Sequence, residues 1–417
     1  MQRPAPLRAT SWLSLPWVIA LLQTFTVVVD SIPVRGFGVD GDCVRFPTLI
    51  QFLAVVTKSS LVCLPARKVT VPVKKANTLR NRWFPAVALA VTATLLAACG
   101  GGSSDVVGGD GQGAADTTLT LIAFAVPEPG WSKIIPAFAA TPEGKGVAVT
   151  TSYGASGDQS RAVVDGKPAD LVNFSVEPDI TRLVKAEKIA KDWNADVTKG
   201  VPFGSVVSLV VRKGNPKNIK DWDDLLQPGL EVVSPSPLSS GSAKWNLLAP
   251  YAAKSDGGKN AQAGLDFVSK LVTEHIKTRP GSGREATDLF LQGTGDVLLS
   301  YENEAINVER QGKPVEHVNP PQTFKIENPV AVVTSSAHLE QANALKNFLY
   351  TDEGQKLWAE AGFRPVSPKV AEDFSTDFPT PEKLWTIADL GGWSTVDPAL
   401  FDKDNGSITK IYKQATG

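Results

Sequence analysis

The segment PSPLSSGSAKWNLLAPYAA, residues 235–253, sets the pattern around which the rest of the chain is organised. Its prolines indicate a turn, and Ser239-Ser240-Gly241-Ser242 leads directly into an amphipathic stretch that predicts a helix. The first N–H groups of a helix have no partner inside the helix, and the helix dipole favours an anion there. Gly241 adds no side chain that would keep an anion away. The segment therefore predicts an anion-binding helix N-terminus.

Two other segments repeat this arrangement. Ser156-Gly157 opens SGDQSRAVVDG, and Ser282-Gly283 opens SGREATDLFLQG. A single Ser-Gly pair at a helix start is more often only an N-cap, in which the serine oxygen accepts a hydrogen bond from the first turn. Three such starts in one domain, each after a turn signal, predict three sets of backbone amides that converge on one small oxyanion.

Short apolar strands alternate with helices after residue 117. The segments TLTLIAFAV (118–126), VAVTTSYG (147–154) and ADLVNFSV (169–176) are typical of buried strands, and helical segments separate them. This alternation indicates an α/β fold with parallel strands. With 417 residues, the chain is long enough for two sizeable lobes.

Charge is distributed unevenly along the chain. The whole chain holds 42 Lys and Arg against 43 Asp and Glu, but residues 1–98 hold 11 basic and only 3 acidic residues. Residues 99–417 therefore hold 31 basic and 40 acidic residues, a net charge of −9. A net-acidic body argues against nucleic acid as a partner. An anion that it binds must be held by local dipoles rather than by a basic surface.

The cysteines and histidines exclude several kinds of site. No cysteine follows Cys99, so the body has neither a disulfide framework nor a thiolate metal site. The three histidines, which have no metal-ligand spacing, are His275, His317 and His338. We therefore expect neither a metal nor another cofactor.

Residues 73–98 are typical of a secretory signal peptide. Basic side chains between residues 74 and 82 precede the apolar run from Trp83 to Leu96, which is too short for a comfortable bilayer span. Leu96-Ala97-Ala98-Cys99 resembles a bacterial lipobox, in which the cysteine is lipidated and becomes the mature N-terminus. We therefore expect the body to be anchored by a lipid at Cys99 on the outer face of the cytoplasmic membrane.

Residues 1–72 do not resemble a domain. Their apolar runs are short or interrupted, and they precede a complete signal peptide. Met1 is the only methionine of the chain, so translation could start at an alternative codon that is read here as Val71 or Val73. We expect this extension to be non-native or unstructured, and absent from the protein made in the cell.

The remaining chain is expected to divide into a tether, two lobes and a tail. Residues 99–116, rich in Gly, Ser and Asp, predict a flexible tether. Lobe I is expected to comprise residues 117–206 and 320–375, and lobe II residues 207–319. Residues 376–417 are expected to pack on the lobes as a C-terminal segment.

A series of segments in the body, in one particular order, indicates its family. They are SYGASG (152–157), VRKGNPKNIKDWDDLLQPG (211–229), SPSPLSSGSAKWN (234–246), GSGREAT (281–287), GDVLLSYENEA (295–305), TDEGQKLW (351–358) and GGW (391–393). With these segments the body resembles the sulfate-binding proteins of bacterial ABC importers, over nearly all of residues 118–417. The whole series makes the resemblance specific.

This resemblance implies a type II periplasmic-binding-protein fold: two α/β lobes, each a mixed sheet flanked by helices, joined by a hinge and closing over one dehydrated sulfate. It implies a monomer without catalytic residues that delivers the anion to a membrane permease driven by an ATPase. Matched position by position, it places the Ser240 hydroxyl and an aromatic donor, Tyr301, at the anion, and Arg284 as an organiser of the neighbouring loop. The backbone amide donors are expected at Ser156, Gly241, Ser242 and Gly283.

The sequence departs from the family pattern at some of these positions. Tyr301 stands where the family has tryptophan, and Pro127, in the loop after the first strand, has no N–H to give. Asp158 stands where lysine or a neutral residue is usual. A carboxylate facing the site would favour phosphate, which retains a proton, over sulfate, which does not. We expect Asp158 instead to complement the dipole of its helix, with Gln159 completing a capping box.

Two other functions stay open at this stage. One is binding of another tetrahedral oxyanion: thiosulfate, molybdate or phosphate. The other is an envelope hydrolase, since Gly154-Ala155-Ser156-Gly157 is close to a nucleophile elbow. That motif needs glycine at position 158, which is aspartate, and no histidine is paired with a serine in the sequence. Catalysis is therefore the less favoured interpretation.

Overall fold

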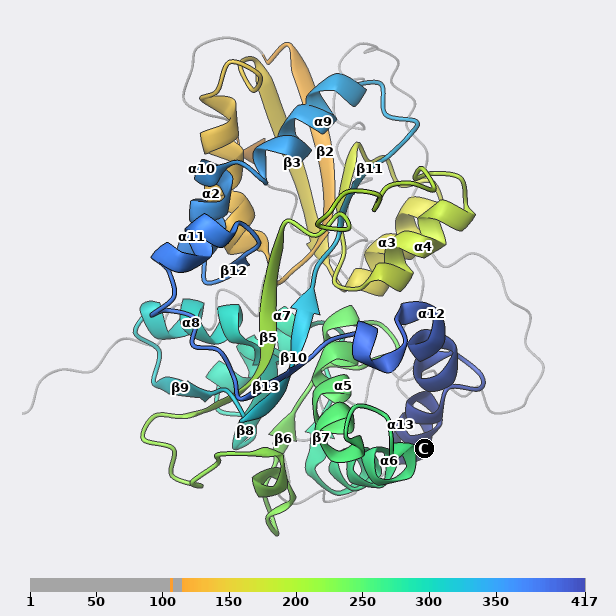
Figure 1. The fold of residues 1–417 in the computed structure, drawn as a ribbon, viewed down its shortest axis with the longest axis vertical. Helices are drawn as coiled ribbons and strands as arrows, with labels where there is room; N and C mark the ends of the chain where they lie inside the picture. Colours follow the sequence, from red (N-terminus) through yellow and green to blue (C-terminus); the bar gives the residue numbers. More distant parts are fainter. Residues whose placement is uncertain (1–105, 108–114, 417) are drawn as a thin grey trace, which may run out of the picture. The chain divides into compact units, whose positions relative to one another are not determined.

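The computed structural model describes residues 106–107 and 115–416, all of which belong to one compact unit, Val91–Gly417. The expectations for residues 1–98 and for the lipidated Cys99 lie outside the described residues. Within the described part of the chain, no helix has both the length and the apolar character needed to cross a membrane. Two β-sheets with helices beside them make up this part (Figure 1).

The first sheet is mixed, with β2 at its centre. β2 runs parallel to both β3 and β4, whereas β1 and β11 pair antiparallel at the two edges. Strands covered on both faces are rich in apolar residues, as in the buried half of β2. In spatial order the strands are β1 (Val106–Val107), β3 (Val147–Gly154), β2 (Thr117–Phe124), β4 (Leu171–Asn173) and β11 (Val330–Val332).

β1 falls within residues 99–116, for which the sequence predicts a flexible tether. Val106 and Val107 pair with Thr150 and Val149 of β3, and the tether stays a prediction. The physical reason is the free edge of β3, whose backbone N–H and C=O groups can pair with any short extended segment. The two valines are the β-branched residues in a stretch otherwise dominated by Gly, Ser and Asp.

The second sheet is also mixed and is built around β5 (Phe203–Arg212). β5 pairs antiparallel with β8, β9, β10 and β12, while β6 is parallel to β7 and β8, and β13 is parallel to β10. The expected α/β fold with two mixed sheets is confirmed. The other strands are β6 (Val232–Val233), β7 (Ile276–Thr278), β8 (Val297–Tyr301), β9 (Val315–Val318), β10 (Gln322–Glu327), β12 (Arg364–Pro365) and β13 (Lys383–Trp385).

Two strands lie at the points where the chain passes between the sheets. Residues 203–206, which the sequence predicts in lobe I, belong to β5, and β5 lies wholly in the second sheet. β10 also lies there, although lobe I was expected to resume at residue 320. β5 is buried along nearly its whole length, so its sequence shows no alternation that could reveal which sheet it joins. The division into lobes beyond these strands stays a prediction.

Helices lie beside each sheet, as Figure 1 shows. Those beside the first sheet are α2 (Glu128–Ala139), α3 (Ser156–Val164), α4 (Glu177–Lys185), α9 (Leu339–Phe348), α10 (Asp352–Glu360) and α11 (Pro368–Asp373). Those beside the second are α5 (Gly241–Ser255), α6 (Ala261–Lys270), α7 (Gly283–Leu291) and α8 (Glu302–Arg310).

The C-terminal segment lies against the second sheet and its helices (Figure 1). It supplies β13 to the sheet, and α13 (Ser407–Thr416) packs on α6. Trp393, the first residue of α12 (Trp393–Val396), meets Trp245 of α5 edge to face, with 4.9 Å between the ring centroids. The short helical turns of the chain are η1 (Trp222–Leu226), η2 (Leu271–His275), η3 (Ala388–Leu390) and η4 (Asp397–Phe401).

Aromatic side chains fill the core where the chain enters the second sheet. The centroid of the Phe203 ring lies 3.9 Å from that of Trp358 and 4.6 Å from that of Phe363. Trp131 meets Trp358 edge to face at 5.4 Å. A Cβ on Gly130 would lie 2.1 Å from the Trp358 ring, so this close approach requires glycine. The cluster therefore fixes α2 and α10 against the start of β5.

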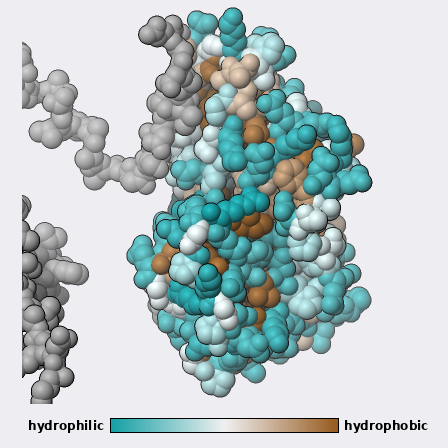
Figure 2. All heavy atoms as spheres, turned by 90° about the vertical axis from the view of Figure 1, so that its left-hand side faces the viewer, coloured by the Kyte–Doolittle hydropathy of each residue, from teal (hydrophilic) through white to brown (hydrophobic). Residues whose placement is uncertain are grey.

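The surface carries few large apolar side chains. The face in Figure 2 is mostly hydrophilic, with apolar residues in small patches. Among the residues that the structure describes, the exposed large apolar side chains are Val197, Leu238 and Leu339. The apolar side chains of the body are therefore gathered in its core, as expected of a folded α/β protein.

Candidate functional site

The N-termini of α3, α5 and α7 meet at one place. A Cβ on Gly241, the first residue of α5, would lie 3.2 Å from the Cβ of Ser156, the first residue of α3. A Cβ on Gly283, the first residue of α7, would lie 2.8 Å from Ser242 Oγ. The structure thus brings together the three helix starts that the sequence singled out.

The site lies between elements of the two sheets. α3 follows β3 of the first sheet, whereas α5 and α7 follow β6 and β7 of the second. The Gly157 N–H donates to the Ser239 carbonyl oxygen over 3.1 Å, which joins α3 directly to the turn before α5. The side chains here are buried: Ser156 is 2% exposed and Ser240 3%. A ligand at this place would be removed from bulk water.

The caps of these helices leave backbone N–H groups available. The N-cap residues of α3, α5 and α7 are Ala155, Ser240 and Ser282. Of these three, Ser282 caps its helix: its hydroxyl oxygen accepts a hydrogen bond from the Glu285 N–H over 3.2 Å. Ser240 Oγ lies 2.7 Å from Ser242 Oγ instead. Simple N-capping therefore explains the serine before α7 but not the helix starts of α3 and α5, whose first-turn N–H groups have no intrahelical acceptor.

The Ser156 hydroxyl is occupied by protein groups. Its Oγ donates to Asp179 Oδ2 over 2.6 Å and accepts from the Ser175 N–H at 2.9 Å. Asp179, in the first turn of α4, is itself paired with Arg182 at 2.8 Å. The backbone N–H of Ser156 is therefore the group that Ser156 can offer to a ligand, and its role as a ligand donor stays a prediction.

Tyr301 ends β8 and is the N-cap residue of α8. Its Oη lies 2.7 Å from Ser175 Oγ, and the side chain is 1% exposed. Burial raises the pKa of the Tyr301 phenol far above its usual value, and hydrogen bonds from Ser175 and Asn328 only partly oppose this. The phenol therefore stays protonated at neutral pH and keeps one proton to donate.

Arg284 joins α7 to α8. Its guanidinium lies 3.0 Å from Glu304 Oε1, and the Thr287 hydroxyl donates to Glu304 Oε2 over 2.9 Å. Burial raises the pKa of the Glu304 carboxyl, and the charge of Arg284 counteracts this. The contact suits the expected role of Arg284 as an organiser of the loop, which stays a prediction.

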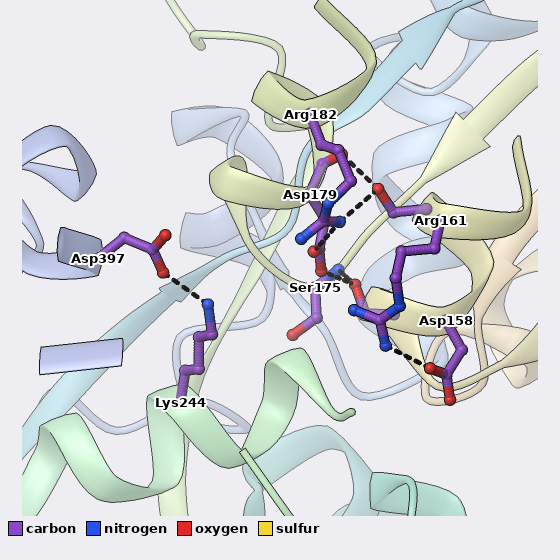
Figure 3. Close-up of polar contacts among 9 residues, drawn as sticks. Asp158, Arg161, Ser175, Asp179, Arg182, Lys244 and Asp397 are labelled. Atoms are coloured by element: carbon purple, nitrogen blue, oxygen red, sulfur yellow. Dashed lines mark hydrogen bonds and ion pairs between the residues drawn. The ribbon is translucent and has the colours of Figure 1, made fainter. Parts of the chain in front are cut away.

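The expectation that Asp158 and Gln159 form a capping box is wrong. Asp158 pairs with Arg161 one turn further along α3, and its side chain is 61% exposed (Figure 3). The Gln159 amide donates to the Ser152 carbonyl oxygen over 3.1 Å and accepts from Lys167. The Gln159 side chain thus bonds Ser152 and Lys167 instead of the start of its own helix, and the Asp158 carboxylate pairs with Arg161.

The cationic side chains on α3, α5 and α7 are already neutralised. Each one forms an ion pair with a carboxylate, and Figure 3 shows two of these pairs, Arg161–Asp158 and Lys244–Asp397. The other two are Lys254–Asp223 and Arg284–Glu304. A bound anion would therefore be held by helix N-termini and neutral donors, which require neither a counter-cation nor a proton on the ligand.

Known proteins share this sequence and this fold. Residues 119–364 match the model of a family described as bacterial extracellular solute-binding protein. The chain belongs to this family.

The relatives of this solute-binding protein include proteins for two sulfur oxyanions. A sulfate-binding protein of Synechococcus elongatus is 37% identical over 353 residues, which are 82% of this chain and 99% of that protein. The solved structure of the sulfate-binding protein SubI from Mycobacterium tuberculosis H37Rv is 74% identical, with a TM-score of 0.68, covering 69% of this chain and 100% of that one. A thiosulfate-binding protein of Pseudomonas aeruginosa is 34% identical over 279 residues, 65% of this chain and 83% of that protein.

These matches confirm the resemblance to the sulfate-binding proteins of ABC importers that the sequence indicated, together with the expected two-lobed fold class. The names of these relatives describe binding proteins. They do not test the roles of single residues, so the ligand donors of this solute-binding protein stay predictions.

Sequence reasoning missed Ser175. It follows β4, which is parallel to β2 and β3, and ligands of open α/β sheets bind beyond the carboxyl ends of such strands. Its position after a buried strand was therefore a signal, although the segment ADLVNFSV attracts attention mainly through its apolar residues. In this solute-binding protein Ser175 contacts Ser156, Tyr301 and the first residue of α5.

Neither His275 nor His317 is hydrogen-bonded to a serine of the site. The His275 ring lies 3.0 Å from the Leu230 carbonyl oxygen, and the His317 ring lies 2.9 Å from Glu309. Among the described residues, no group of three or more His, Cys, Asp and Glu could hold a metal ion. The geometry therefore lends no support to a serine nucleophile at Ser156, whose hydroxyl donates to Asp179.

Proposed function

We propose that this solute-binding protein captures inorganic sulfate and delivers it to the permease of an ABC importer, which an ATPase drives. The observation that carries the proposal is the convergence of the N-termini of α3, α5 and α7 at a buried place where the cations of these helices are already ion-paired. Such a site suits a fully ionised dianion that needs donors alone. The names of the relatives in Synechococcus elongatus and Mycobacterium tuberculosis point to the same ligand.

The proposed donors follow from the positions of these groups. Backbone amides act at the three helix starts, and the hydroxyls of Ser240 and Tyr301 complete the set. Arg284 supports α7 through Glu304 and does not touch the anion. Binding needs neither a metal nor another cofactor. The amides are those of Ser156, Gly241, Ser242 and Gly283.

Thiosulfate is the second candidate. It is the ligand in the name of the Pseudomonas aeruginosa relative, and Tyr301 is smaller than the tryptophan of the family pattern, which would leave room for a larger terminal sulfur atom. Phosphate is less favoured, because the carboxylate that could have accepted its proton, Asp158, is turned toward Arg161.

We expect sulfate to raise the melting temperature of the protein more than equal concentrations of thiosulfate, molybdate or phosphate. A ligand that binds only the folded state stabilises it by about 2.7 kcal/mol at a concentration a hundred times its dissociation constant. The same ranking is expected for Asp158→Asn, because Asp158 does not face the site. A wild type that prefers phosphate, and loses this preference in Asp158→Asn, would contradict the assignment. Turnover of a generic ester substrate would support the hydrolase instead.

We further propose that the mature protein is a lipid-anchored monomer that begins at Cys99, on the outer face of the cytoplasmic membrane. The lipobox-like sequence before Cys99 and the signal-peptide pattern of residues 73–98 support this. We expect the intact mass of protein extracted from membranes of the native host to correspond to a diacylated or triacylated chain starting at Cys99. Peptides from residues 1–60 in that material would contradict the expected start.

A further inference from the structure

Ser175 uses all of its polar atoms to connect the elements around the site. Its N–H donates to Ser156 Oγ at 2.9 Å, and its carbonyl oxygen accepts from Trp245 Nε1 at 2.8 Å and from Asn328 Nδ2 at 2.9 Å. Its Oγ lies 2.7 Å from Tyr301 Oη. Ser175 follows a strand of the first sheet and Tyr301 ends a strand of the second, so this last contact joins the two halves of the site.

The side chain of Ser175 has little freedom to move. It is fully buried, and a Cβ on Gly241 would lie 2.7 Å from its Cβ and 3.0 Å from its Oγ. The start of α5 therefore packs directly on this side chain. Its hydroxyl oxygen is held at a fixed place next to the Tyr301 phenol.

The two hydroxyls share one hydrogen bond, so the direction of that bond decides what Tyr301 offers to a ligand. If Tyr301 donates to Ser175, the phenol presents lone pairs to its other neighbours and would repel an anion. If Ser175 donates to Tyr301, the phenolic proton is free to point elsewhere. Ser175 is fully buried, and among the described residues its hydroxyl oxygen is hydrogen-bonded to the Tyr301 phenol alone, so the second arrangement is the one that gives the Ser175 proton an acceptor.

We propose that Ser175 is a positioning residue whose hydroxyl donates to the Tyr301 oxygen and thereby directs the Tyr301 proton at the bound anion. The proposal rests on the proposed function, because it places the anion against Tyr301. A chain of donors that ends on a negative charge is polarised cooperatively along its length. Ser175 and Tyr301 then determine affinity as one unit, although Ser175 itself does not touch the ligand.

A double-mutant cycle in the mature protein tests the coupling. Sulfate titrations by calorimetry at constant ionic strength would compare wild type, Ser175→Ala, Tyr301→Phe and the double variant. We expect about fivefold to tenfold weaker binding for Ser175→Ala and about tenfold to a hundredfold for Tyr301→Phe. The double variant should bind about as weakly as Tyr301→Phe alone, because without the phenol oxygen Ser175 has nothing to orient.

A matched control separates this role from a general loss of a buried hydroxyl. Thr323 is buried in β10, and its hydroxyl donates to the Val207 carbonyl oxygen. Thr323→Val removes one buried hydrogen bond outside the site and should leave sulfate affinity unchanged. Losses that multiply in the double variant, or an unchanged affinity of Ser175→Ala, would overturn the proposal for Ser175. A wild type that does not bind sulfate would instead overturn the proposed function.

Resonance Raman spectra of the wild type give a readout that does not depend on a Ser175 variant. The tyrosine ring doublet reports whether a phenol donates or accepts hydrogen bonds, and subtracting the Tyr301→Phe spectrum isolates Tyr301 from the other four tyrosines. We expect Tyr301 to be both acceptor and donor in the sulfate-bound protein. A Tyr301 that does not accept a hydrogen bond in the bound state would refute the proposed direction.

Discussion

Gly241→Asp is expected to abolish sulfate binding. The new carboxylate would stand at the first residue of α5, where the proposed anion needs the positive end of the helix dipole. Two unit charges 4 Å apart near a protein surface repel each other by about 4 kcal/mol, which is roughly a thousandfold in affinity. Calorimetric titration with sulfate would measure the loss.

The structure adds a steric reason to this electrostatic one. A Cβ at position 241 would lie 2.7 Å from the Ser175 Cβ and 3.2 Å from the Ser156 Cβ, closer than side chains normally approach. Gly241→Ala therefore separates the two causes: it adds the Cβ without the charge, and its loss of affinity should be smaller but clear.

A carboxylate at another helix start serves as the control. Ala261→Asp introduces the same charge at the exposed first residue of α6, and it should leave the titration unchanged. If Gly241→Asp bound sulfate within tenfold of the wild type, the anion would have to bind elsewhere.

The parts of the site that could be predicted from the sequence are those that depend on neighbours along the chain. A helix that begins with small residues after a turn has free N–H groups wherever it lies, so Gly241 and Gly283 could be recognised locally. Their convergence was inferred from the repetition of the pattern and from the family resemblance. In the structure Gly241 packs against Ser175, and Gly283 packs against Ser242.

The wrong expectation of a capping box at Asp158 and Gln159 shows where local reasoning fails. A carboxylate in the first turn can cap its helix, or it can pair with a cation three residues later, and both outcomes are compatible with SGDQSR. The choice depended on Gln159, which bonds Ser152 and Lys167 instead of the helix start. These partners come from β3 and from the loop after α3, and no local pattern indicates them.

Individual side-chain contacts between distant segments could not be predicted from the sequence. Ser175 and Tyr301 are 126 residues apart, and Glu302 and Arg364 are 62 residues apart. Such pairs form because the two sheets bring strand ends together. The same limitation applies to β5, since a strand buried along nearly its whole length fits either sheet until its hydrogen-bonding partners are known.

The second large effect is expected on stability, at the buried ion pair between Arg364 and Glu302. Arg364 Nε and Nη2 lie 2.6 Å and 2.8 Å from the two carboxylate oxygens of Glu302, which is fully buried at the start of α8. The Asn319 amide donates to the same carboxylate over 2.6 Å. Arg364 lies in β12, so the pair fastens the segment after α10 to the helix that follows Tyr301.

Arg364→Met is expected to lower the free energy of unfolding by about 3–5 kcal/mol, because it leaves the buried Glu302 carboxylate without its counter-charge. Urea unfolding of the ligand-free protein, analysed by linear extrapolation, would measure the change. Arg364→Met combined with Glu302→Gln should be less unstable than the sum of the single variants, since the second substitution removes the uncompensated charge. Lys133→Met breaks the half-exposed pair with Glu360 and should cost only about 0–1 kcal/mol. Equal effects of Arg364→Met and Lys133→Met would show that burial of the Glu302 pair does not matter for stability. Additive losses in the variant that combines Arg364→Met with Glu302→Gln would show that the two charges do not depend on each other.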